Sequence, residues 1–499
     1  MRSLYTGLSR LFLFFFPIRS DELRKFIPFC LLIFITTFVH HLLRVVKDPL
    51  VLSEPGSGAE VLSFLKLYFA LPASMLATMM YMSLRKRSSM SFTYYVIVGG
   101  YAAFIILYAF CIYPNVAWLH PSPLKIAFLQ RSYPMFRWFF TIWGMWTYAF
   151  YYVTAEIWGT FVLSVMFWQL ANDNIGVKQA ETFYPLFVTI SNVALLFLNP
   201  LVKYIADSKV NDMLEANIVV VCCSVMMLAV FYYLDTQGMS EGAPEAVSNK
   251  LKPKSKSVFS DGLALLWRSE YVGYLTMLVF CYACIVTLVE VTWKSQIRLL
   301  YPSRASYMAF YADYTFYTGI VTILLNYLSK TVIQRFGWTV GAIITPISCG
   351  IFGSLFYIFM LVQNAHFYGF DQGFMIHCAV WIGALSVMMS RGAKYAFFDP
   401  TKEMAFIPLE KNLSVNGKAI ADGMGSKFGK SFGGCLVSTS MMLSGQDLEG
   451  LCVWLGMIVL CLSIFWLFAV LRLSVLYGRQ VREATMYVDA NGLEEWTSA

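Results

Sequence analysis

Four charged residues lie inside long apolar stretches of this sequence: Lys47, Glu156, Glu290 and Lys430. A charge at the centre of a membrane-spanning helix costs about 2.5–3.5 kcal/mol on insertion scales. Such a residue is therefore kept when it is paired, faces an aqueous cavity or binds a ligand. Because cations outnumber carboxylates in these stretches, we expect a binding site for a multivalent anion.

The first of these cations, Lys47, also has a purely structural interpretation. It lies in HHLLRVVKDPL beside Asp48, where Pro49 indicates a helix end and a long side chain can reach the membrane surface. Arg44 lies one turn before Lys47, so two like charges share a face and repel unless an anion sits between them. Arg44 and Asp48 are therefore candidate phosphate or cavity residues as well.

The two carboxylates differ in how they can be neutralised. Glu156 has no charged neighbour one turn away on its own helix, so its partner must come from another helix or from the cargo. Glu290 can pair with Lys294 at i+4, and Lys294 is also a candidate cavity residue. Arg391 and Lys394 are expected at the cytoplasmic end of a span.

A stripe of small residues recurs every fourth position in GKAIADGMGSKFGKSFGG. Such a stripe lets a neighbouring backbone approach closely. Lys427 and Lys430 lie in the same segment, so the side of the helix opposite the small residues should line water or cargo. The GKS sequence does not have the spacing of a nucleotide-binding P-loop, and no strand precedes it. The stripe consists of Gly417, Ala421, Gly425, Gly429 and Gly433.

Other chemistry is sparse. His40 and His41 are adjacent in the first apolar stretch and are either a proton relay or a polar packing pair. No nucleophile–base set, metal cluster or dinucleotide motif is present in the sequence, so no metal or cofactor is expected. An integral-membrane enzyme acting on a phosphorylated substrate is the competing class, but its clustered histidines are missing. A transporter of a multivalent anion fits best, with nucleotide, sugar phosphate and peptide all open.

The composition places these residues in a bilayer. Apolar residues make up 58% of the chain and charged residues only 13%, whereas soluble domains are nearer half apolar and a quarter charged. Stretches of about 20 apolar residues predict twelve spans, or eleven if the Gly- and Lys-rich segment 412–445 is not one. They are 26–46, 61–84, 92–113, 136–170, 183–205, 216–234, 271–293, 308–333, 338–362, 372–395, 412–445 and 450–477, of which 136–170 is long enough to be broken.

A polar, basic gap divides these spans into two sets of six. The chain is thus predicted to comprise an N-terminal half (1–234), a cytoplasmic linker (235–270) and a C-terminal half (271–499). This all-α layout is typical of major-facilitator transporters. Lys and Arg cluster after the second, sixth and last spans, so the positive-inside rule predicts that both termini are cytoplasmic. The N-terminal LFLFFFP is too short for a span and reads as an interfacial segment.

Several motifs resemble the bacterial and plastid ATP/ADP translocase family. They cover nearly the whole chain and are highly specific. A transit peptide is missing, which favours the bacterial branch found in obligate intracellular bacteria such as chlamydiae. The motifs are PIRSDELRKFIP (17–28), PGSGAE (55–60), EIWGTFVLSVMFWQLAND (156–173), LVEVTWKSQI (288–297), QRFGW (334–338), KYAFFDPTKEMAFIPLE (394–410) and GKAIADGMGSKFGKSFGG (417–434).

The resemblance implies nucleotide transport across the bacterial inner membrane without hydrolysis. Family members exchange ATP for ADP and phosphate or import nucleotides with protons. The family's four transport-relevant charges match Lys47, Glu156, Glu290 and Lys430, where cations would hold phosphates and carboxylates would bind, gate or couple. The expected partners are nucleotides, with protons or phosphate as co-substrate, and the bilayer. Nucleic acid is not expected, and the chain is expected to act as a monomer.

The chain departs from the family's exchangers at standard places. It reads VKDPL for TKDTL, EIWGT for ELWGS and GKSFGGC for GKSGGS. These departures favour a divergent paralogue that imports several nucleoside triphosphates with protons, and strict ATP/ADP exchange is the alternative. In a proton-coupled importer, His40 and His41 become candidate protonation sites. Candidates for stacking on the base, chosen by position only, are Tyr152, Phe167, Trp168 and Tyr395.

Overall fold

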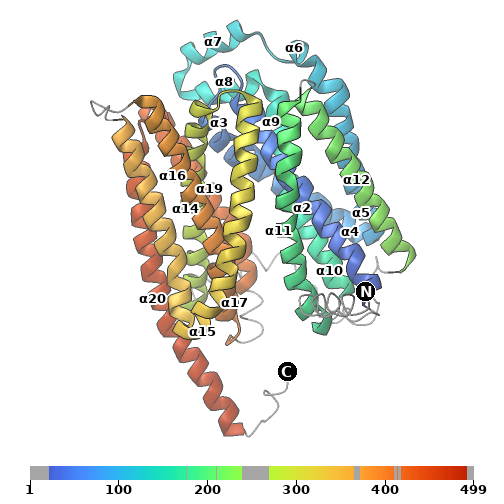
Figure 1. Cartoon of the computed structure of the whole chain (residues 1–499), viewed down its shortest axis with the longest axis vertical. Helices are drawn as coiled ribbons and strands as arrows, with labels where there is room; N and C mark the ends of the chain where they lie inside the picture. The colour runs from blue at the N-terminus through green and yellow to red at the C-terminus, as the bar shows by residue number, and fades with distance from the viewer. Residues whose placement is uncertain are drawn as a thin grey trace, which may run out of the picture. The chain divides into compact units, whose positions relative to one another are not determined.

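The computed structural model describes residues 22–175, 177–208, 211–238, 269–364, 371–409, 413 and 417–491. Within these ranges every regular element is a helix (Figure 1). Ten of the described helices are long and apolar enough to cross a membrane. The predicted all-α, multi-pass membrane protein is therefore confirmed.

The described residues form two compact units. The first contains the described part of 22–238 together with Tyr301–Gly319, and the second contains the described residues of 269–300 and those from Ile320 onward. Helices of the first unit are α2 (Leu23–Leu52), α3 (Ala59–Phe64), η1 (Leu65–Ala70), α4 (Leu71–Arg87), α5 (Met90–Leu107), η2 (Tyr108–Ile112), η3 (Tyr113–Asn115), α6 (Val116–Leu119), α7 (Pro123–Ser132), η4 (Pro134–Phe136), α8 (Arg137–Gly144), α9 (Trp146–Trp158), η5 (Gly159–Phe167), α10 (Trp168–Asn174), α11 (Val177–Asp207) and α12 (Asp212–Thr236).

The second unit contains α14 and the helices that follow it, except for the first residues of α15. Within α15 the backbone at Gly337 leaves the helical region, with φ of 81° and ψ of 177°, and the chain turns back there (Figure 1). The helices are α14 (Glu270–Leu300), α15 (Arg304–Asn364), α16 (Gln372–Ala393), η6 (Lys394–Phe398), α17 (Asp399–Phe406), η7 (Ala419–Gly425), α19 (Ser426–Ser444) and α20 (Cys452–Asn491).

The first residues of α15 group with the first unit, although they were predicted to belong to the C-terminal half. Polar contacts account for this. Arg304 donates to the hydroxyl of Tyr113 at 2.7 Å and lies 3.3 Å from a carboxylate oxygen of Asp212. Asp313 pairs with Lys203 at 2.7 Å. Residues 239–268 of the predicted linker lie outside the described residues, so the division at 235–270 stays a prediction.

The predicted spans coincide with described helices. The predicted break in 136–170 is confirmed, because Met145 (φ −125°, ψ 40°) separates α8 from α9. Two predicted spans, 308–333 and 338–362, form the two arms of α15 on either side of Gly337. Segment 412–445 contains η7 and α19, which are not among the ten candidate spans. The count of twelve therefore stays a prediction.

The first helix of each predicted half is the central one of its unit. Of the apolar 18-residue window in each helix, 61% is buried in α2 and 67% is buried in α14. In the span Met90–Leu119 the buried share is only 28%. In the first unit α2 packs against α9, α11 and α12, and in the second α14 packs against α16, α19 and α20. A charge on such a helix is surrounded by protein rather than lipid, which explains how both helices carry several.

The small-residue stripe packs on α14, as predicted. A Cβ atom at Gly429 would lie 2.5 Å from the carbonyl oxygen of Phe280, and one at Gly433 would lie 3.1 Å from that of Cys284. Only glycine allows two helix backbones to approach this closely. The stripe therefore positions α19, and the lysines on it, against the central helix of the second unit.

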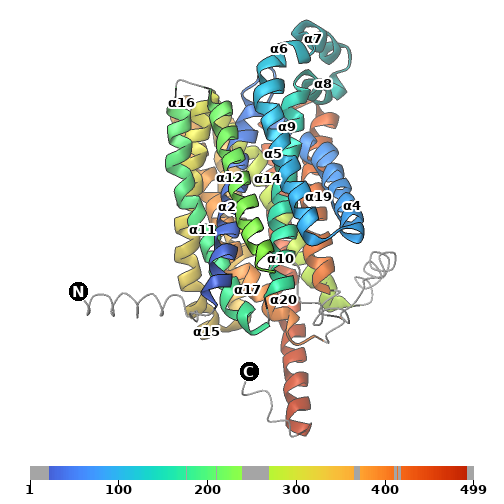
Figure 2. The ribbon, with the colours of Figure 1, turned by 90° about the vertical axis from the view of Figure 1, so that its right-hand side faces the viewer.

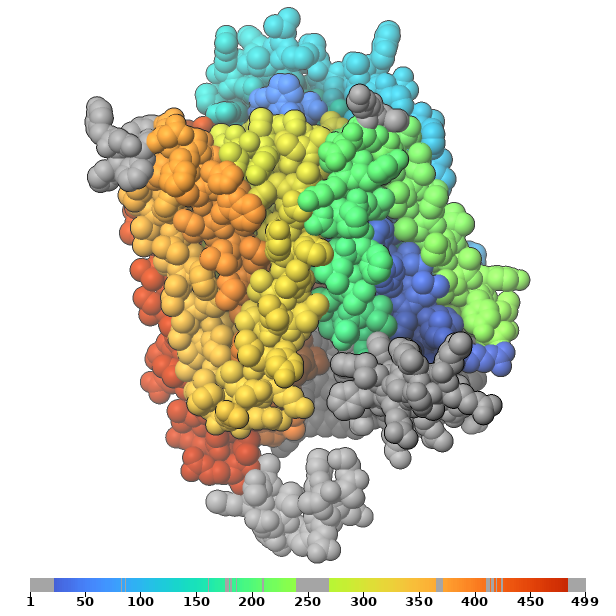
Figure 3. Space-filling view, viewed as in Figure 1, coloured from blue at the N-terminus to red at the C-terminus, as the bar shows by residue number. Residues whose placement is uncertain are grey.

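Helices α6, α7 and α8 lie at one end of the first unit, away from the end at which α2 begins (Figure 2). They connect the span Met90–Leu119 to the span Trp146–Asn174. Figure 3 shows α6 and α7, in cyan, open at the surface of that end. This segment carries many exposed side chains.

Candidate functional site

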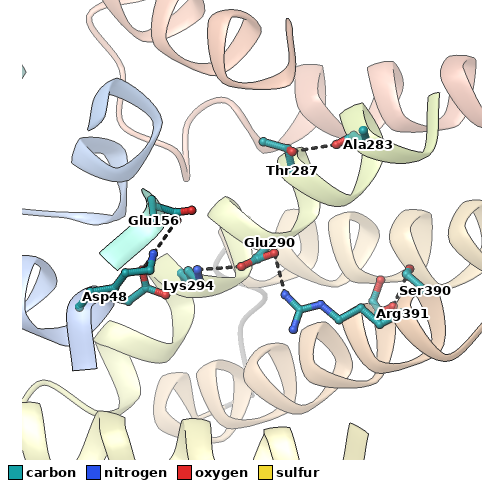
Figure 4. Close-up of polar contacts among 10 residues, drawn as sticks. Asp48, Glu156, Ala283, Thr287, Glu290, Lys294, Ser390 and Arg391 are labelled. Atoms are coloured by element: carbon teal, nitrogen blue, oxygen red, sulfur yellow. Dashed lines mark hydrogen bonds and ion pairs between the residues drawn. The ribbon is translucent and has the colours of Figure 1, made fainter. Parts of the chain in front are cut away.

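In the first unit, an ion-paired cluster forms around Lys47. Its Nζ atom lies 2.6 Å from Oε1 of Glu156 and 3.2 Å from Oδ1 of Asp48 (Figure 4). The same ammonium lies 3.9 Å from the ring centroid of Tyr152, where the π face adds to the attraction. The Lys47 side chain is only 5% exposed, whereas that of Glu156 is 32% exposed. The partner predicted for Glu156 on another helix is thus Lys47 of α2.

The helix that carries Lys47 does not end before Pro49, contrary to the sequence-based expectation. It continues to Leu52, because its last turns are buried on all sides and Ser53 donates its backbone N–H to the carbonyl of Pro49. Lys47 and Asp48 are 4% and 0% exposed, so Lys47 does not reach the membrane surface. Protein packing outweighs the local tendency of proline to end a helix.

Two further cations act on Glu156. Arg44, one turn before Lys47 on α2, and Lys66, on the π-helix η1, both attract its carboxylate electrostatically. Arg44 was expected to lie near an anion, and the carboxylate of Glu156 is one anion that it attracts. Lys66 was missed, although it is the one charged residue in the predicted span 61–84. A lone cation in an apolar span was the signal that could have identified it.

In the second unit, Glu290 on α14 holds two cations. Its Oε1 lies 2.8 Å from Nζ of Lys294 and its Oε2 lies 2.9 Å from a guanidinium nitrogen of Arg391 (Figure 4). The three side chains are 8%, 1% and 15% exposed. The i+4 pair suggested by the sequence is therefore present, and Arg391 on α16 completes it.

The apolar segment that contains Arg391 continues beyond it, through η6 and α17, to Phe406. The expectation that Arg391 lies at the cytoplasmic end of a span stays a prediction. Lys394 pairs with Asp399 at 2.6 Å, and its Nζ lies 4.5 Å from the ring centroid of Tyr395, which is 49% exposed. Sequence reasoning missed Arg391 because its carboxylate partner lies on another helix, about one hundred positions away in the chain.

Lys427 and Lys430 both lie on exposed positions of α19. The glycines at 425, 429 and 433 take the side against α14, as expected of a helix that packs on one face and offers cations on another. At the start of this segment, Lys402 pairs with Asp422 at 2.5 Å and Lys418 pairs with Glu403 at 2.5 Å. Lys402 and Lys418 thus have carboxylate partners, and Lys427 and Lys430 lie at exposed positions of α19.

The remaining sequence candidates lie in packed surroundings. The rings of His40 and His41 are 5.0 Å apart, and the His40 ring contacts Gly159, the first residue of η5. Phe167 is buried against Phe29 and Phe187, with Trp168 5.4 Å from Phe167. Tyr152 is fully buried beneath Lys47. Their roles in protonation and base stacking stay predictions.

The sequence model of the TLC ATP/ADP transporter family matches residues 4–477 of this chain. The chain belongs to the TLC ATP/ADP transporter family. Among curated relatives of this family member, ADP,ATP carrier protein 3 of Rickettsia bellii is 30% identical over 485 residues, covering 92% of this chain and 96% of the relative. ADP,ATP carrier protein 1 of Chlamydia muridarum is 32% identical and covers 93% and 90%.

Solved structures show that the TLC family member shares its fold with other transporters. A D-xylose-proton symporter matches with a TM-score of 0.56 at 13% identity, covering 90% of this chain and 97% of the symporter. The nucleoside transporter NupG matches with a TM-score of 0.53 at 12% identity, covering 91% and 99%. The predicted major-facilitator-type fold is thereby confirmed. Because the family consists of transporters, the competing interpretation as a membrane enzyme is wrong.

Proposed function

We propose that this transporter carries nucleoside triphosphates and ATP/ADP across the bacterial inner membrane by alternating access, as a proton-coupled importer with both termini in the cytoplasm, acting as a monomer. The observation that carries the proposal is that several cations converge on each of two carboxylates inside the helices. Lys47 contacts Glu156, which Arg44 and Lys66 also attract. Glu290 lies between Lys294 and Arg391.

Cations gathered in this way suit a multivalent anion. A phosphate chain offers several oxygen acceptors, and lysine and arginine are its usual partners in proteins. In the absence of cargo, Glu156 and Glu290 neutralise these cations, so the empty protein does not leave them unpaired. The names of the curated relatives support ATP and ADP as cargo. Lys430 and Lys427, on the exposed side of α19, add further positive charge.

Glu156 is the carboxylate best suited to couple transport to protons. It is 32% exposed while its partner Lys47 is 5% exposed, so it can swing away when a phosphate takes its place beside the ammonium. A carboxylate that loses its cation binds a proton more readily. Phosphate binding and proton uptake would then occur together, as proton symport requires. His40 and His41 are the second candidates for the coupled proton.

Strict ATP/ADP exchange is the alternative transport mode, and the names of the relatives favour it. Uptake of labelled ATP, GTP, CTP and UTP by bacterial cells expressing the protein separates the two. For a proton-coupled importer, a protonophore should abolish uptake of all accepted nucleotides, with unmodified label recovered inside. If uptake instead requires internal ADP and withstands the protonophore, the protein is an exchanger.

Replacing Lys66 by glutamine should weaken triphosphate uptake more than diphosphate uptake. One cation is lost from the cluster around Glu156, and a triphosphate offers more negative charge to that cluster. We expect KM to rise about tenfold for ATP, equivalent to about 1.4 kcal/mol, and less for ADP. Lys330→Gln, at an exposed position of α15, is the matched control and should leave both values unchanged. Equal effects on ATP and ADP would mean that Lys66 does not contact the phosphate chain.

A further inference from the structure

We propose that residues 116–145, which we call the outer hood, form a capture site for the phosphate groups of the nucleotide, ahead of the buried clusters. This proposal rests on the proposed function and adds a second, external binding site to it. The outer hood comprises α6, α7 and α8 with the turns between them.

Helix α7 has one packed face and one open face. On the packed face, Ile126 lies where it would touch a Cβ atom at Gly144, and Gln130 donates to the hydroxyl of Thr141 at 2.9 Å. On the opposite face, Leu124, Lys125, Phe128 and Arg131 are exposed, Leu124 by 84% and Phe128 by 68%. The spacing of Leu124, Phe128 and Arg131 places them on one side of the helix. The contacts of α7 with Gly144 and Thr141 of α8, named above, lie on the other side of the helix.

The charged residues that belong to the outer hood itself are all positive. Lys125, Arg131 and Arg137 are exposed, and the sequence has no aspartate or glutamate between Glu60 and Glu156. Glu60 lies on α3, which packs on α8, and its side chain is buried. Surfaces lined by one sign of charge raise the local concentration of oppositely charged ligands. A nucleotide triphosphate, with several negative charges, is the cargo that gains most from such a surface.

Aromatic rings hold two of these cations and offer stacking surfaces. Nζ of Lys125 lies 5.2 Å from the Trp143 ring centroid, and the guanidinium of Arg137 lies 4.5 Å from that of Trp138. Trp118 is 91% exposed, and Tyr133 and Phe136 are also exposed. Base–aromatic stacking tolerates every base, because every base has a π face. Cations for phosphate and rings for the base thus occur on the same surface.

The outer hood is connected to the cation cluster of the first unit. Phe139 of α8 lies 5.2 Å from Phe64 and 5.1 Å from Tyr68, measured between ring centroids. Phe64 and Tyr68 flank Lys66 in the chain, two residues away on either side. Lys66 in turn attracts Glu156 electrostatically. A nucleotide held on the outer hood would therefore lie close, through Phe139 of α8, to the segment of η1 that carries Lys66.

The charge of the outer hood does not change near neutral pH. Burial lowers the pKa of His120, whose Nε2 lies 2.6 Å from the hydroxyl of Thr147, so this histidine stays neutral above its ordinary pKa. Above about pH 7 the positive charge therefore comes from lysine and arginine, which remain protonated there. Any capture effect should consequently be sensitive to salt and insensitive to pH between about 7 and 8, where a terminal phosphate with a pKa of about 6 is also largely ionised.

Anionic lipid headgroups present the same phosphate chemistry, and the experiment separates the two sources. The full-length protein, wild type or the triple variant Lys125→Gln/Arg131→Gln/Arg137→Gln, is reconstituted in vesicles of phosphatidylcholine alone or with phosphatidylglycerol. ATP uptake is measured at low and high salt. We expect the triple variant to raise KM about fivefold to tenfold at low salt in phosphatidylcholine, with Vmax unchanged and a flatter salt dependence. The double variant Lys330→Gln/Arg335→Gln, at exposed positions of α15, should match the wild type.

Three results would overturn the proposal. The first is an unchanged KM for a triple variant whose melting temperature equals that of the wild type. The second is a difference that occurs only in vesicles with phosphatidylglycerol, which would make the outer hood a lipid contact. The third is a wild-type protein that does not take up nucleotide at all, which would contradict the proposed function as well. Normal wild-type uptake with either of the first two results would leave the proposed function standing.

Discussion

Replacing Lys47 by glutamine should reduce nucleotide uptake at least about 100-fold, which corresponds to about 2.7 kcal/mol of lost stabilisation. The ammonium of Lys47 lies 2.6 Å from Oε1 of Glu156 and 3.2 Å from Oδ1 of the fully buried Asp48. Glutamine keeps the approximate length of the side chain but removes the charge that a phosphate would bind. Uptake of labelled ATP, normalised to protein in the membrane, measures the effect.

A companion variant separates loss of binding from loss of structure. Breaking one side of a buried ion pair is destabilising, because the other charge is left without compensation. In Lys47→Gln/Glu156→Gln both charges of this pair are removed, but Asp48 still loses its contact with Lys47. We therefore expect the melting temperature to recover in part while uptake stays low. Recovery of uptake along with stability would show that Lys47 serves the fold and does not bind cargo. We expect Lys430→Gln to abolish uptake without any change in melting temperature, since Lys430 is exposed.

Replacing Gly429 by alanine should separate α19 from α14 and destabilise the second unit by about 2–3 kcal/mol. The new Cβ atom would lie 2.5 Å from the carbonyl oxygen of Phe280 and 2.9 Å from the Cβ atom of Ala283. A backbone oxygen cannot rotate away as a side chain can, so the two helices must move apart. We expect a lower melting temperature in detergent and a lower yield of folded protein.

The matched control for Gly429→Ala is Gly100→Ala. A Cβ atom at Gly100, on α5, would meet no atom within 4 Å, so alanine should be neutral or slightly stabilising there. Adding Ala283→Gly to Gly429→Ala removes one of the two close contacts but leaves the one with Phe280. Only partial recovery is therefore expected. Unchanged stability of Gly429→Ala would mean that α19 does not pack on α14 through its glycines.

The sequence predicted the membrane fold well because each span is encoded locally. Length and apolarity of a segment decide whether it crosses the bilayer, and the predicted segments coincide with described helices. The interruption near Met145 and the contact between the glycine stripe and a neighbouring helix were also predictable, since both depend on local backbone chemistry. Segment 412–445 was harder to assign as a span because its lysine, serine and glycine residues lower its mean hydropathy.

Pairings between helices were less predictable. That Glu156 needs a partner from elsewhere followed from its isolation in the sequence, but its identity as Lys47 depends on how α9 packs on α2. Arg391 was placed at a membrane surface because of its position near the end of a predicted span, and its pairing with Glu290 of α14 was not foreseen. Lys66 was overlooked. Which charged residues pair inside a membrane protein depends on how the helices pack. The local sequence shows only that a charge needs a partner.

The turn at Gly337 affects how the topology of this transporter can be mapped. Trp338 donates its indole N–H to the carbonyl of Thr401 at 2.7 Å and stacks on Tyr477, with ring centroids 4.9 Å apart. The two arms of α15 thus meet with no loop between them, and an epitope or reporter domain inserted there would pull Trp338 out of both contacts. Point labels are the better choice. A cysteine at Phe336, which is 64% exposed, would report the side of the membrane while leaving the turn intact.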